Sequence, residues 1–381
     1  MIRSFPNVRL RILTALFLVT VFVGAQKIET VNGVRVVHNE KGGQWGANLE
    51  VKLELVRTIG GLDAEENLSF NLPNDIVRDS VGNLYILDSD NNRIQKLDLR
   101  GKFIKTIGRK GQGPGEFQRA QSMDIDEQDN IFVFDSGNAR IQVISPEGRP
   151  LKTIKLLFSV AGRIRLLKSG LIVKDGAFYY SVRIERPKKL PKLLEIIDQN
   201  GRTKLAFGEA MDYKDADVNS WANFVKYDTD AEKNIYLSFD RQNRIEKYAP
   251  DGTLLWRADR QLDYGTGYVK GSTKQGMPMN VVSRGIAADG KGRIWVITNR
   301  RQMTQEERGK RISAVGVTRM IAEPKIDKLD IYKLEIFSPE GVLLGEIPLN
   351  HLAGGIRIFG DTLFIWEYSN TTFYQYKIIE K

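Results

Sequence analysis

The sequence predicts an all-β fold, a six-bladed β-propeller of four-stranded antiparallel blades whose last blade is closed by an N-terminal strand. Three observations support this prediction: a pattern that repeats every few tens of residues, six short apolar second strands, and two chain ends that complement each other. The chain has 381 residues and 41% hydrophobic residues, which is ample for one large core.

Two segments near the start of the chain carry the repeat most clearly. "NDIVRDSVGNLYILDSDNNRIQKLDLRGKFIKTIG" (74–108) aligns with "QSMDIDEQDNIFVFDSGNARIQVISPEGRPLKTIK" (121–155). Each contains an alternating strand, an aspartate turn, an apolar second strand, an Asn-x-Arg-Ile-Gln segment that opens a third strand, and a glycine turn into a fourth. Such a four-stranded antiparallel meander is one propeller blade.

The remaining blades repeat the pattern in weaker form. Residues 226–258 are a clear copy, residues 162–176 with 192–208 form another blade, and residues 284–298 with 329–349 form one that is split by an insertion. Six second strands indicate six blades; they are "LYILD", "IFVFD", "LIVKD", "IYLSF", "IWVIT" and "LFIWE".

The two ends of the chain predict how the ring closes. The C-terminal "IRIFGDTLFIWEYSNTTFYQYKII" supplies only three strands, whereas the N-terminal "EVKLELVRTIG" (50–60) resembles the fourth strand of the first repeat. Pairing of these segments would complete the last blade and remove an exposed sheet edge. The expected organisation is a signal peptide (1–25), a linker (26–48) and a propeller (49–381).

The first 25 residues have the features of a secretory signal peptide. Arg3, Arg9 and Arg11 precede an apolar run from Ile12 to Val23, and Gly24 and Ala25 supply small residues for cleavage before Gln26. The run is shorter than the roughly 20 residues of a membrane-spanning helix. We therefore expect a periplasmic or extracellular protein without a transmembrane segment in the mature chain, with a retained N-terminal anchor as the alternative.

The repeats resemble the NHL class of six-bladed propellers. The resemblance is carried by the glycine-rich lead-in "GRKGQGPGEF" (108–117), the Asp-x-x-Gly/Asp-Asn turn, a strand that ends in Asp-Ser, and Asn-x-Arg-Ile-Gln. Residues 67–145 follow the class well, although Ala120 stands where the class usually has proline. The resemblance implies a propeller scaffold on which unrelated activities occur.

The glycine-rich lead-in has two interpretations. A phosphate-binding loop would need a strand before the glycines and a helix after them. Here "MDIDEQDNIFVFD" follows, which is strand, turn and strand, so a tight connection between blades is favoured. The recurrent pairs Asp88 with Arg93, Asp135 with Arg140 and Asp240 with Arg244 are likewise expected to hold loops. The aspartates Asp79, Asp126, Asp230 and Asp289 are expected to be turn residues.

Composition excludes several kinds of chemistry. The chain has no cysteine, so disulfides, thiolate catalysis and cysteine-based zinc sites are excluded. Its two histidines, His38 and His351, exclude a multi-histidine metal site and have no recognisable catalytic context. We expect no metal and no cofactor.

The long additions to the blade pattern fall in connections that emerge on one face of a propeller. They cover residues 177–191, 209–222, 259–282 and 299–328. Removing residues 1–25 lowers the net charge from +10 to +7, and residues 181–192 and 299–328 carry +4 each, so the rest of the mature chain carries −1. The predicted ligand-binding residues in these additions are Arg183, Arg186, Lys188, Lys189, Trp221, Arg308, Lys310 and Arg311.

Two functions are compatible with this pattern. The first is a non-catalytic exported scaffold whose basic face binds an unknown protein, an anionic polysaccharide or another anionic ligand; nucleic acid is not expected. The second is a metal-dependent hydrolase or lyase of lactonase type at the mouth of the channel. Its donors would be acids and amides near the first strands, such as Asn74, Asp75, Ser122, Asn223 and Asn280.

Overall fold

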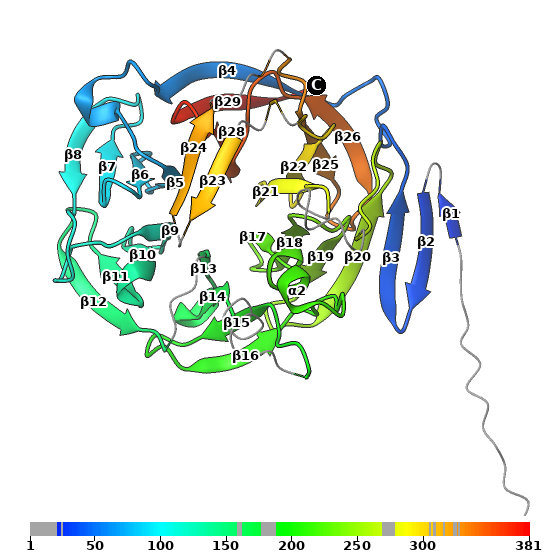
Figure 1. Cartoon of the computed structure of the whole chain (residues 1–381), viewed down its shortest axis with the longest axis horizontal. Coiled ribbons are helices and arrows are strands. Elements are labelled where there is room, and N and C mark those ends of the chain that lie inside the picture. The colour runs from blue at the N-terminus through cyan, green and yellow to red at the C-terminus, as the bar shows by residue number, and fades with distance from the viewer. Residues whose placement is uncertain are drawn as a thin grey trace, which may run out of the picture.

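Six antiparallel sheets are arranged in a ring around a central channel in the computed structural model (Figure 1). Each sheet has four blade strands, and the first strand of each blade lies innermost. The structure therefore confirms the six-bladed propeller that the sequence predicts. It describes residues 21–23, 26–157, 162–176, 188–268, 279–304, 306–307, 310–314, 317–322, 326 and 328–381.

The first three blades follow one another along the chain. The first contains β5 (Pro73–Arg78), β6 (Leu84–Asp88), β7 (Arg93–Leu97) and β8 (Phe103–Ile107). The second contains β9 (Ala120–Ile125), β10 (Ile131–Asp135), β11 (Arg140–Ile144) and β12 (Pro150–Lys155). The third contains β13 (Ile164–Leu166), β14 (Ile172–Asp175), β15 (Leu194–Ile197) and β16 (Thr203–Phe207). Short 3-10 turns accompany them at Glu66–Leu68, Ser136–Asn138 and Lys168–Gly170.

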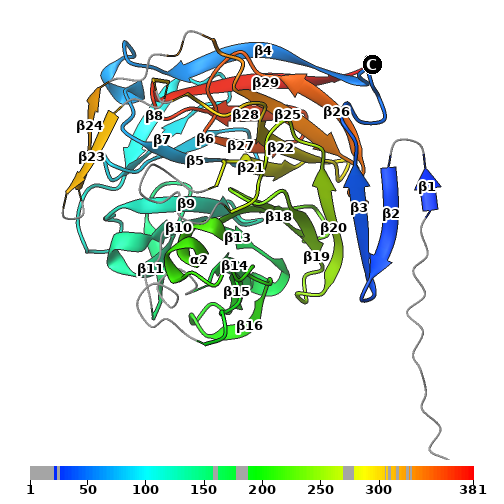
Figure 2. The ribbon, with the colours of Figure 1, turned by 45° about the vertical axis from the view of Figure 1, so that its right-hand side comes forward.

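The last three blades carry the additions to the basic pattern. The fourth contains β17 (Val225–Thr229), β18 (Ile235–Phe239), β19 (Ile245–Tyr248) and β20 (Leu254–Arg260), and the helix α2 (Ala216–Ala222) precedes it. The fifth contains β21 (Ser283–Ala288), β22 (Ile294–Asn299), β25 (Tyr332–Phe337) and β26 (Leu343–Pro348). Its insertion forms a separate hairpin of β23 (Lys310–Ala314) and β24 (Val317–Ala322), which stands clear of the blade sheets in Figure 2.

The sixth blade joins the two ends of the chain. Its inner strands β27 (Gly355–Phe359), β28 (Thr362–Trp366) and β29 (Thr372–Glu380) are C-terminal, and its outer strand is β4 (Val51–Gly60). β29 and β4 pair antiparallel from Thr372 opposite Gly60 to Glu380 opposite Val51. This is the closure that the complementary ends predict, and it pairs the edge of β29 that would otherwise be exposed.

The expected linker over residues 26–48 is wrong for its first half. β2 (Gln26–Val31) and β3 (Val34–Asn39) form a hairpin, and β3 pairs in parallel with β20, so the fourth blade is extended outward. β1 (Val21–Val23) pairs with β2 beyond the hairpin. Asn39 is buried and joins the hairpin to the fifth blade, because its amide donates to the carbonyl of Gly341 and accepts from the backbone N–H of Leu343.

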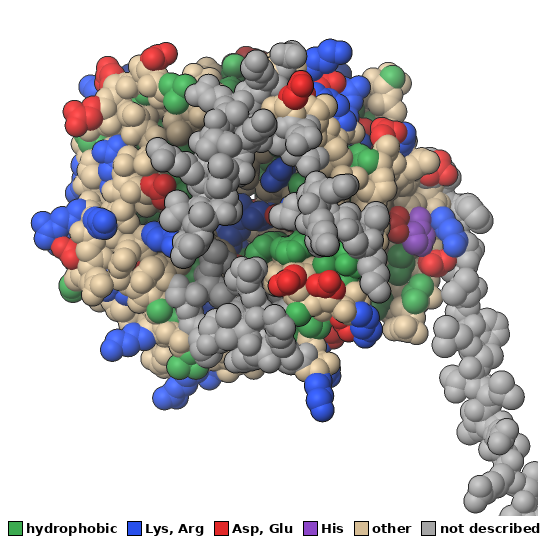
Figure 3. Space-filling view, in the orientation of Figure 1, with side chains coloured by type: hydrophobic (Ala, Val, Ile, Leu, Met, Phe, Trp, Pro, Cys, Tyr) green, Lys and Arg blue, Asp and Glu red, His purple; other side chains and the backbone are tan. Residues whose placement is uncertain are grey.

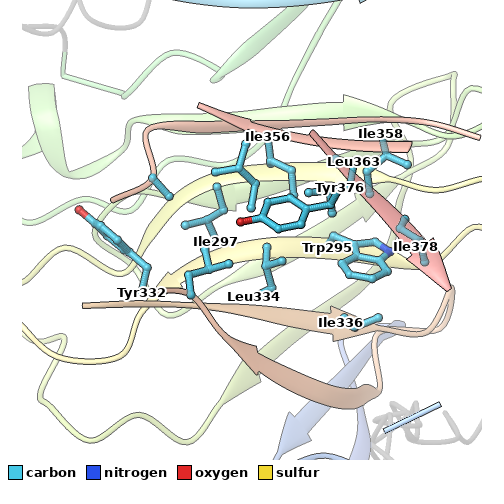
Figure 4. Packing of buried hydrophobic residues seen from close by; sticks show 14 of the residues in the cluster. Trp295, Ile297, Tyr332, Leu334, Ile336, Ile356, Ile358, Leu363, Tyr376 and Ile378 are labelled. Carbon is cyan, nitrogen blue, oxygen red and sulfur yellow. The ribbon is translucent and has the colours of Figure 1, made fainter. Parts of the chain in front are cut away.

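Apolar side chains pack between neighbouring blades and hold the ring together. Between the fifth and sixth blades, Trp295 and Ile297 of β22 face Ile356, Leu363 and their neighbours across the seam (Figure 4). Trp295 is fully buried. Burial of one such large apolar side chain contributes roughly 1.5–3 kcal/mol, so each seam is a strong contact.

The turn aspartates close their hairpins as the sequence predicts. The carboxylate of Asp79 accepts from the backbone and side chain of Asn83, and Asp126, Asp230 and Asp289 make the equivalent backbone contacts. Two of the three expected acid–arginine pairs form, since Arg93 contacts Asp88 and Arg140 contacts Asp135 at 2.8 Å each. The third expectation is wrong: the partner of Arg244 is Glu246, at 3.6 Å, in place of Asp240.

The glycine-rich lead-in is a connection between β8 and β9, and its donors are used within the chain. Gly108 and Gly115 have φ of +82° and +75°, which a side chain would strain. The Glu116 carboxylate accepts from the backbone N–H of Gly113, and the Arg140 guanidinium donates to the Gly113 carbonyl. The loop thus serves as a turn that the second blade braces.

Removal of the Asn39 amide should weaken the seam between the hairpin and the fifth blade. Asn39→Ala deletes three hydrogen bonds of 2.8–3.0 Å, to Asp259, Gly341 and Leu343, and leaves buried backbone groups unsatisfied. We expect a loss of about 2–3 kcal/mol in the free energy of unfolding, measured by urea denaturation. The exposed Thr30→Ala on the same hairpin is the control and should change stability by less than about 0.5 kcal/mol.

Candidate functional site

The four long additions lie on one face of the ring, which we call the loop face. They occupy the connections β14–β15, β16–β17, β20–β21 and β22–β25, which leave the blades at the end where the first strands begin. α2 and the β23–β24 hairpin lie on this face, toward the viewer in Figure 1. The opposite face carries compact turns such as 79–83 and 98–102. Function on a repeat fold is usually carried by such a face.

The predicted basic residues are distributed over this face as far as the structure describes them. Lys188 and Lys189 are exposed beside the third blade. Lys310 and Arg311 lie on β23 of the inserted hairpin. Arg183, Arg186 and Arg308 lie outside the described residues. Lys and Arg side chains also gather at the hollowed centre of this face in Figure 3.

Trp221 lies on α2 and covers a small core of the loop face. It is half-buried and packs against Val218, Ala222 and Met279. The guanidinium of Arg241 lies 5.1 Å from the centre of its ring. Asp215 caps α2 by accepting from the backbone N–H of Val218. A stacking role for Trp221 toward a ligand stays a prediction.

Arg301 anchors the base of the insertion in the fifth blade. Its guanidinium makes paired contacts of 2.7 Å with the Glu307 carboxylate and a further 2.7 Å contact with Asp330, so both ends of the insertion are tied together. The hydrogen bonds from Arg301 lower the pKa of Glu307 to about 2. The ion pairs of Arg301 with Glu307 and Asp330, which join the two ends of the insertion, are therefore present at neutral pH.

Below the centre of the loop face, the channel is filled by a buried ionic cluster, which we call the channel cluster: Asp75, Asp124, Arg165, Asp228 and Arg357. Arg357 Nε contacts Asp75 at 2.9 Å, and Arg357 Nη1 contacts Asp228 at 3.3 Å. Arg165 Nε contacts Asp228 at 2.6 Å. Asp75 and Arg165 are each 1% exposed, so these charges are compensated inside the protein.

Backbone groups complete the channel cluster. The Asp124 carboxylate accepts from the backbone N–H of Leu166 at 2.7 Å, and Asp228 accepts from that of Ala288 at 3.2 Å. Ser122 donates to Asp75 at 3.1 Å. The first strands of all six blades therefore share one network of hydrogen bonds and ion pairs.

The pKa values of the cluster show that its charges are stabilised. Burial alone would raise the pKa of Asp75, but the nearby Arg357 and Arg165 outweigh burial and lower it to about 2. Burial would lower the pKa of Arg165, but Asp228 and Asp75 outweigh it and raise that pKa. Both groups are thus held in their ionised forms.

The acids and amides proposed as metal donors are engaged elsewhere. Asp75 is paired with Arg357, Ser122 donates to Asp75, and Asn74 donates to Ser89. The Asn223 side chain accepts from the backbone N–H of Met211 in the loop before the fourth blade, and Asn280 donates to the Gly265 carbonyl. In the described part of the chain, no group of three or more His, Asp or Glu side chains is placed to hold a metal ion.

Sequence reasoning missed the channel arginines. "GRIRLL" and "GIRIF" place Arg165 and Arg357 at positions that are Val77 and Ala287 in other blades. An arginine inside an otherwise apolar first strand is the detectable feature. Its partners could be named only after the six first strands had been aligned position by position.

A second hollow lies outside the ring, between the N-terminal hairpin and the fifth blade. It has a volume of about 440 Å³, and it is open to solvent. Its walls are mixed in character and carry none of the predicted ligand-binding residues; they are Gln26, Ile28, Arg35, Gln44, Ser338, Glu340 and Val342.

Comparison with known proteins supports the fold. A family model, DUF5128, described as a 6-bladed beta-propeller, matches residues 65–248, slightly less than half of the chain. No curated protein matches the chain. Within the described residues, no helix is long and apolar enough to cross a membrane.

Solved structures share the architecture at low sequence identity. A Bacteroides fragilis protein provisionally named as exported is 11% identical, with a TM-score of 0.60, over 91% of this chain and 99% of that one. A DUF4221-family protein from Bacteroides vulgatus is 11% identical, with a TM-score of 0.56, over 87% and 99%. A virginiamycin B lyase from Staphylococcus aureus is 11% identical, with a TM-score of 0.50, over 87% and 100%. These likenesses show the fold alone.

Loss of one partner from the channel cluster should destabilise the whole ring. Arg357→Met leaves the Asp75 carboxylate buried with less compensation, and we expect a cost of roughly 3–5 kcal/mol in the free energy of unfolding. The double variant Asp75→Asn with Arg357→Met should recover part of that loss, because Asp75, the most buried carboxylate of the cluster, is then neutral, while Asp228 keeps its contact with Arg165. Equal stability of the single and double variants in urea would contradict this account.

The cluster also predicts an acid limit of stability. Because the folded pKa of Asp75 is about 2 and its ordinary value is 3.8, the stabilisation from its charge is present above pH 3.8. It is lost as the pH falls from about 4 toward 2. Urea unfolding at pH 5, 4 and 3 should show a steeper loss for the wild type than for Asp75→Asn. Parallel losses would rule out this role of Asp75.

Proposed function

We propose that this protein is an exported binding protein of the NHL-propeller type whose loop face binds an anionic partner. The observation that carries the proposal is the coincidence of long insertions and excess positive charge on one face of the ring. Residues 181–192, which overlap the insertion 177–191, and residues 299–328 carry +4 each, whereas the rest of the mature chain is near neutral. A field of this kind raises the local concentration of anions at the face.

The position of the charges supports a broad, shallow contact. Lys188 and Lys189 are exposed beside the third blade, and Lys310 and Arg311 belong to the hairpin inserted in the fifth. A partner that reaches both must be extended or large. An acidic polysaccharide fits this requirement, and an acidic segment of a protein is the other candidate.

Export is part of the proposal. It rests on the basic and apolar N-terminal segment with small residues before Gln26. N-terminal sequencing of the protein secreted by its host tests cleavage before Gln26. An intact Met1 on the exported protein would favour a retained anchor.

Charge reversal on the loop face should weaken binding to an anionic polymer. We expect Lys188→Glu with Lys189→Glu to raise the Kd for a uronic acid polysaccharide at least tenfold at low salt, because attraction is replaced by repulsion. The measurement is biolayer interferometry of the full mature chain, with the salt concentration varied.

The matched control reverses two charges on the opposite face. Arg100 and Lys102 are exposed in the turn between β7 and β8. Arg100→Glu with Lys102→Glu makes the same change in net charge and should leave affinity within twofold. Equal losses in the two variants would show a general charge effect and overturn the assignment to the loop face. Binding only to an acidic peptide would identify a protein partner instead.

A further inference from the structure

The inner positions of the first strands form two layers in the channel. Asp124, Arg165, Asp228 and Arg357 pair with equivalent residues of their second strands, so they occupy one level, which we call the lower layer. Ser122, Arg163 and Lys226 stand two residues before Asp124, Arg165 and Asp228, and Asp75 stands two residues before Val77 of the first blade; these four residues occupy a second level, the upper layer. First strands begin at the loop face, so the upper layer lies nearer that face.

The lower layer is electrically balanced, and the upper layer is not. The lower layer has two arginines and two aspartates, which contact one another or the carboxylate of Asp75. In the upper layer, Asp75 is already the partner of Arg357 from below. Arg163 and Lys226 thus bring two positive charges to a level at which the one carboxylate of the first strands, that of Asp75, is already paired.

Arg163 has no partner for its guanidinium among the described residues. It is 9% exposed, and its Nη1 is fully buried without a hydrogen bond. Arg165 also has a buried Nη2 without a partner. An unsatisfied buried N–H costs roughly 1–3 kcal/mol, so natural structures fill such sites with water or an ion.

The orientation of both upper-layer cations follows from their strands. Side chains two residues apart on a strand share a face, and Arg165 and Asp228 contact each other in the channel. Arg163 precedes Arg165 by two residues, and Lys226 precedes Asp228 by two. Lys226 therefore lies on the same side of β17 as Asp228, and Arg163 directly precedes β13, on which Arg165 lies; the two cations come from adjacent blades, and Lys226 is half-buried.

The nearby acid Asp175 does not neutralise Arg163. Its carboxylate accepts from the backbone N–H of Arg163 at 2.5 Å and from the hydroxyl of Tyr227 at 3.2 Å, so its hydrogen bonds are to neutral groups, while the charges of Lys226 and Lys174 lie near it. Burial raises the pKa of Asp175, which weakens it further as a counter-ion. The charge of Arg163 acts on Asp75, but its guanidinium forms no hydrogen bond or salt bridge within the described residues.

We propose that the upper layer of the channel is a binding site for one carboxylate group, held by Arg163 and Lys226. A guanidinium presents two parallel N–H groups that match the two oxygens of a carboxylate, and an ammonium adds a second charge. The carboxylate comes from a small free acid or from the acidic end of a larger ligand. The proposal rests on the proposed function only in that the ligand enters from the loop face.

The test is a titration of the mature protein with sodium acetate and sodium malonate at constant ionic strength, followed by calorimetry and by Tm. The wild type should bind saturably, with Tm rising as binding saturates. Arg163→Gln should reduce the affinity at least tenfold, and Lys226→Gln should reduce it several-fold. Arg100→Gln, on the opposite face, should leave it unchanged. Inorganic phosphate at the same ionic strength is the competing anion to compare, because a guanidinium also pairs with phosphate oxygens.

Arg163→Gln also separates binding from a structural role. Since the guanidinium has no partner in the described chain, the variant should keep the wild-type Tm within 2 °C in acetate-free buffer. A large fall in Tm without anion would show that Arg163 is structural and would overturn the proposal. Absence of saturable acetate and malonate binding to the wild type, or wild-type affinity in Arg163→Gln, would overturn it as well.

The two proposals fail separately. Lys188→Glu with Lys189→Glu should leave acetate affinity within twofold, because those lysines lie outside the channel. If the wild type does not bind acetate, and Arg163→Gln still binds the polymer, the carboxylate site is removed and the proposed function stands. If acetate binding requires Arg163 but the protein binds no polymer or peptide, the carboxylate site stands and the proposed function is overturned. Binding of inorganic phosphate in place of acetate would overturn the carboxylate as the ligand class.

Discussion

The ion pairs between Arg357, Asp75 and Asp228 are the contact on which the ring depends. Arg357 comes from the last blade and its partners from the first and fourth, so one guanidinium spans the channel. Arg165 of the third blade contacts the same Asp228, and Asp124 and Asp228 accept backbone N–H groups from the third and fifth blades. A change in the relative height of any blade would break a contact in this network.

Such a cluster contributes specificity more than stability. Desolvation of buried charges largely offsets their mutual attraction, whereas the apolar seams between blades supply net free energy without directional preference. An apolar seam tolerates a small shift, but a bidentate contact of 2.9–3.3 Å between Arg357 and Asp75 does not. We infer that the cluster sets the register of the six blades and that β4 then locks it by closing the sixth.

The sequence was sufficient for the features that repeat. Turn aspartates, glycine turns and apolar second strands are local, and each occurs in several blades, so the fold and its closure could be predicted. The N-terminal hairpin could not, because β3 joins β20 in parallel and has no counterpart in other blades. Its buried Asn39 looks like any exposed polar residue until Gly341 and Leu343 are known to face it.

For the same reason, the sequence did not predict the channel arginines, and it predicted the wrong partner for one arginine, Arg244. Analogy with the first two blades predicts a pair of Arg244 with Asp240, but Glu246 of β19, two residues further on, lies closer to Arg244, which directly precedes that strand. Each channel arginine lies on the first strand of one blade, and its partners lie on the first strands of other blades. A pattern within one repeat cannot show a contact that exists only between repeats.

The separation of the channel into two layers links architecture to binding. Because the charges of the lower layer are paired with one another and with Asp75, this layer forms a fixed base below Arg163 and Lys226, neither of which forms a salt bridge within the described residues. Positive charge that has no internal partner acts on whatever approaches from the loop face, where the basic insertions extend the same field outward. The ring thus keeps its structural charges below and presents its unpaired charges above, which is the arrangement that a binding site for an anion requires.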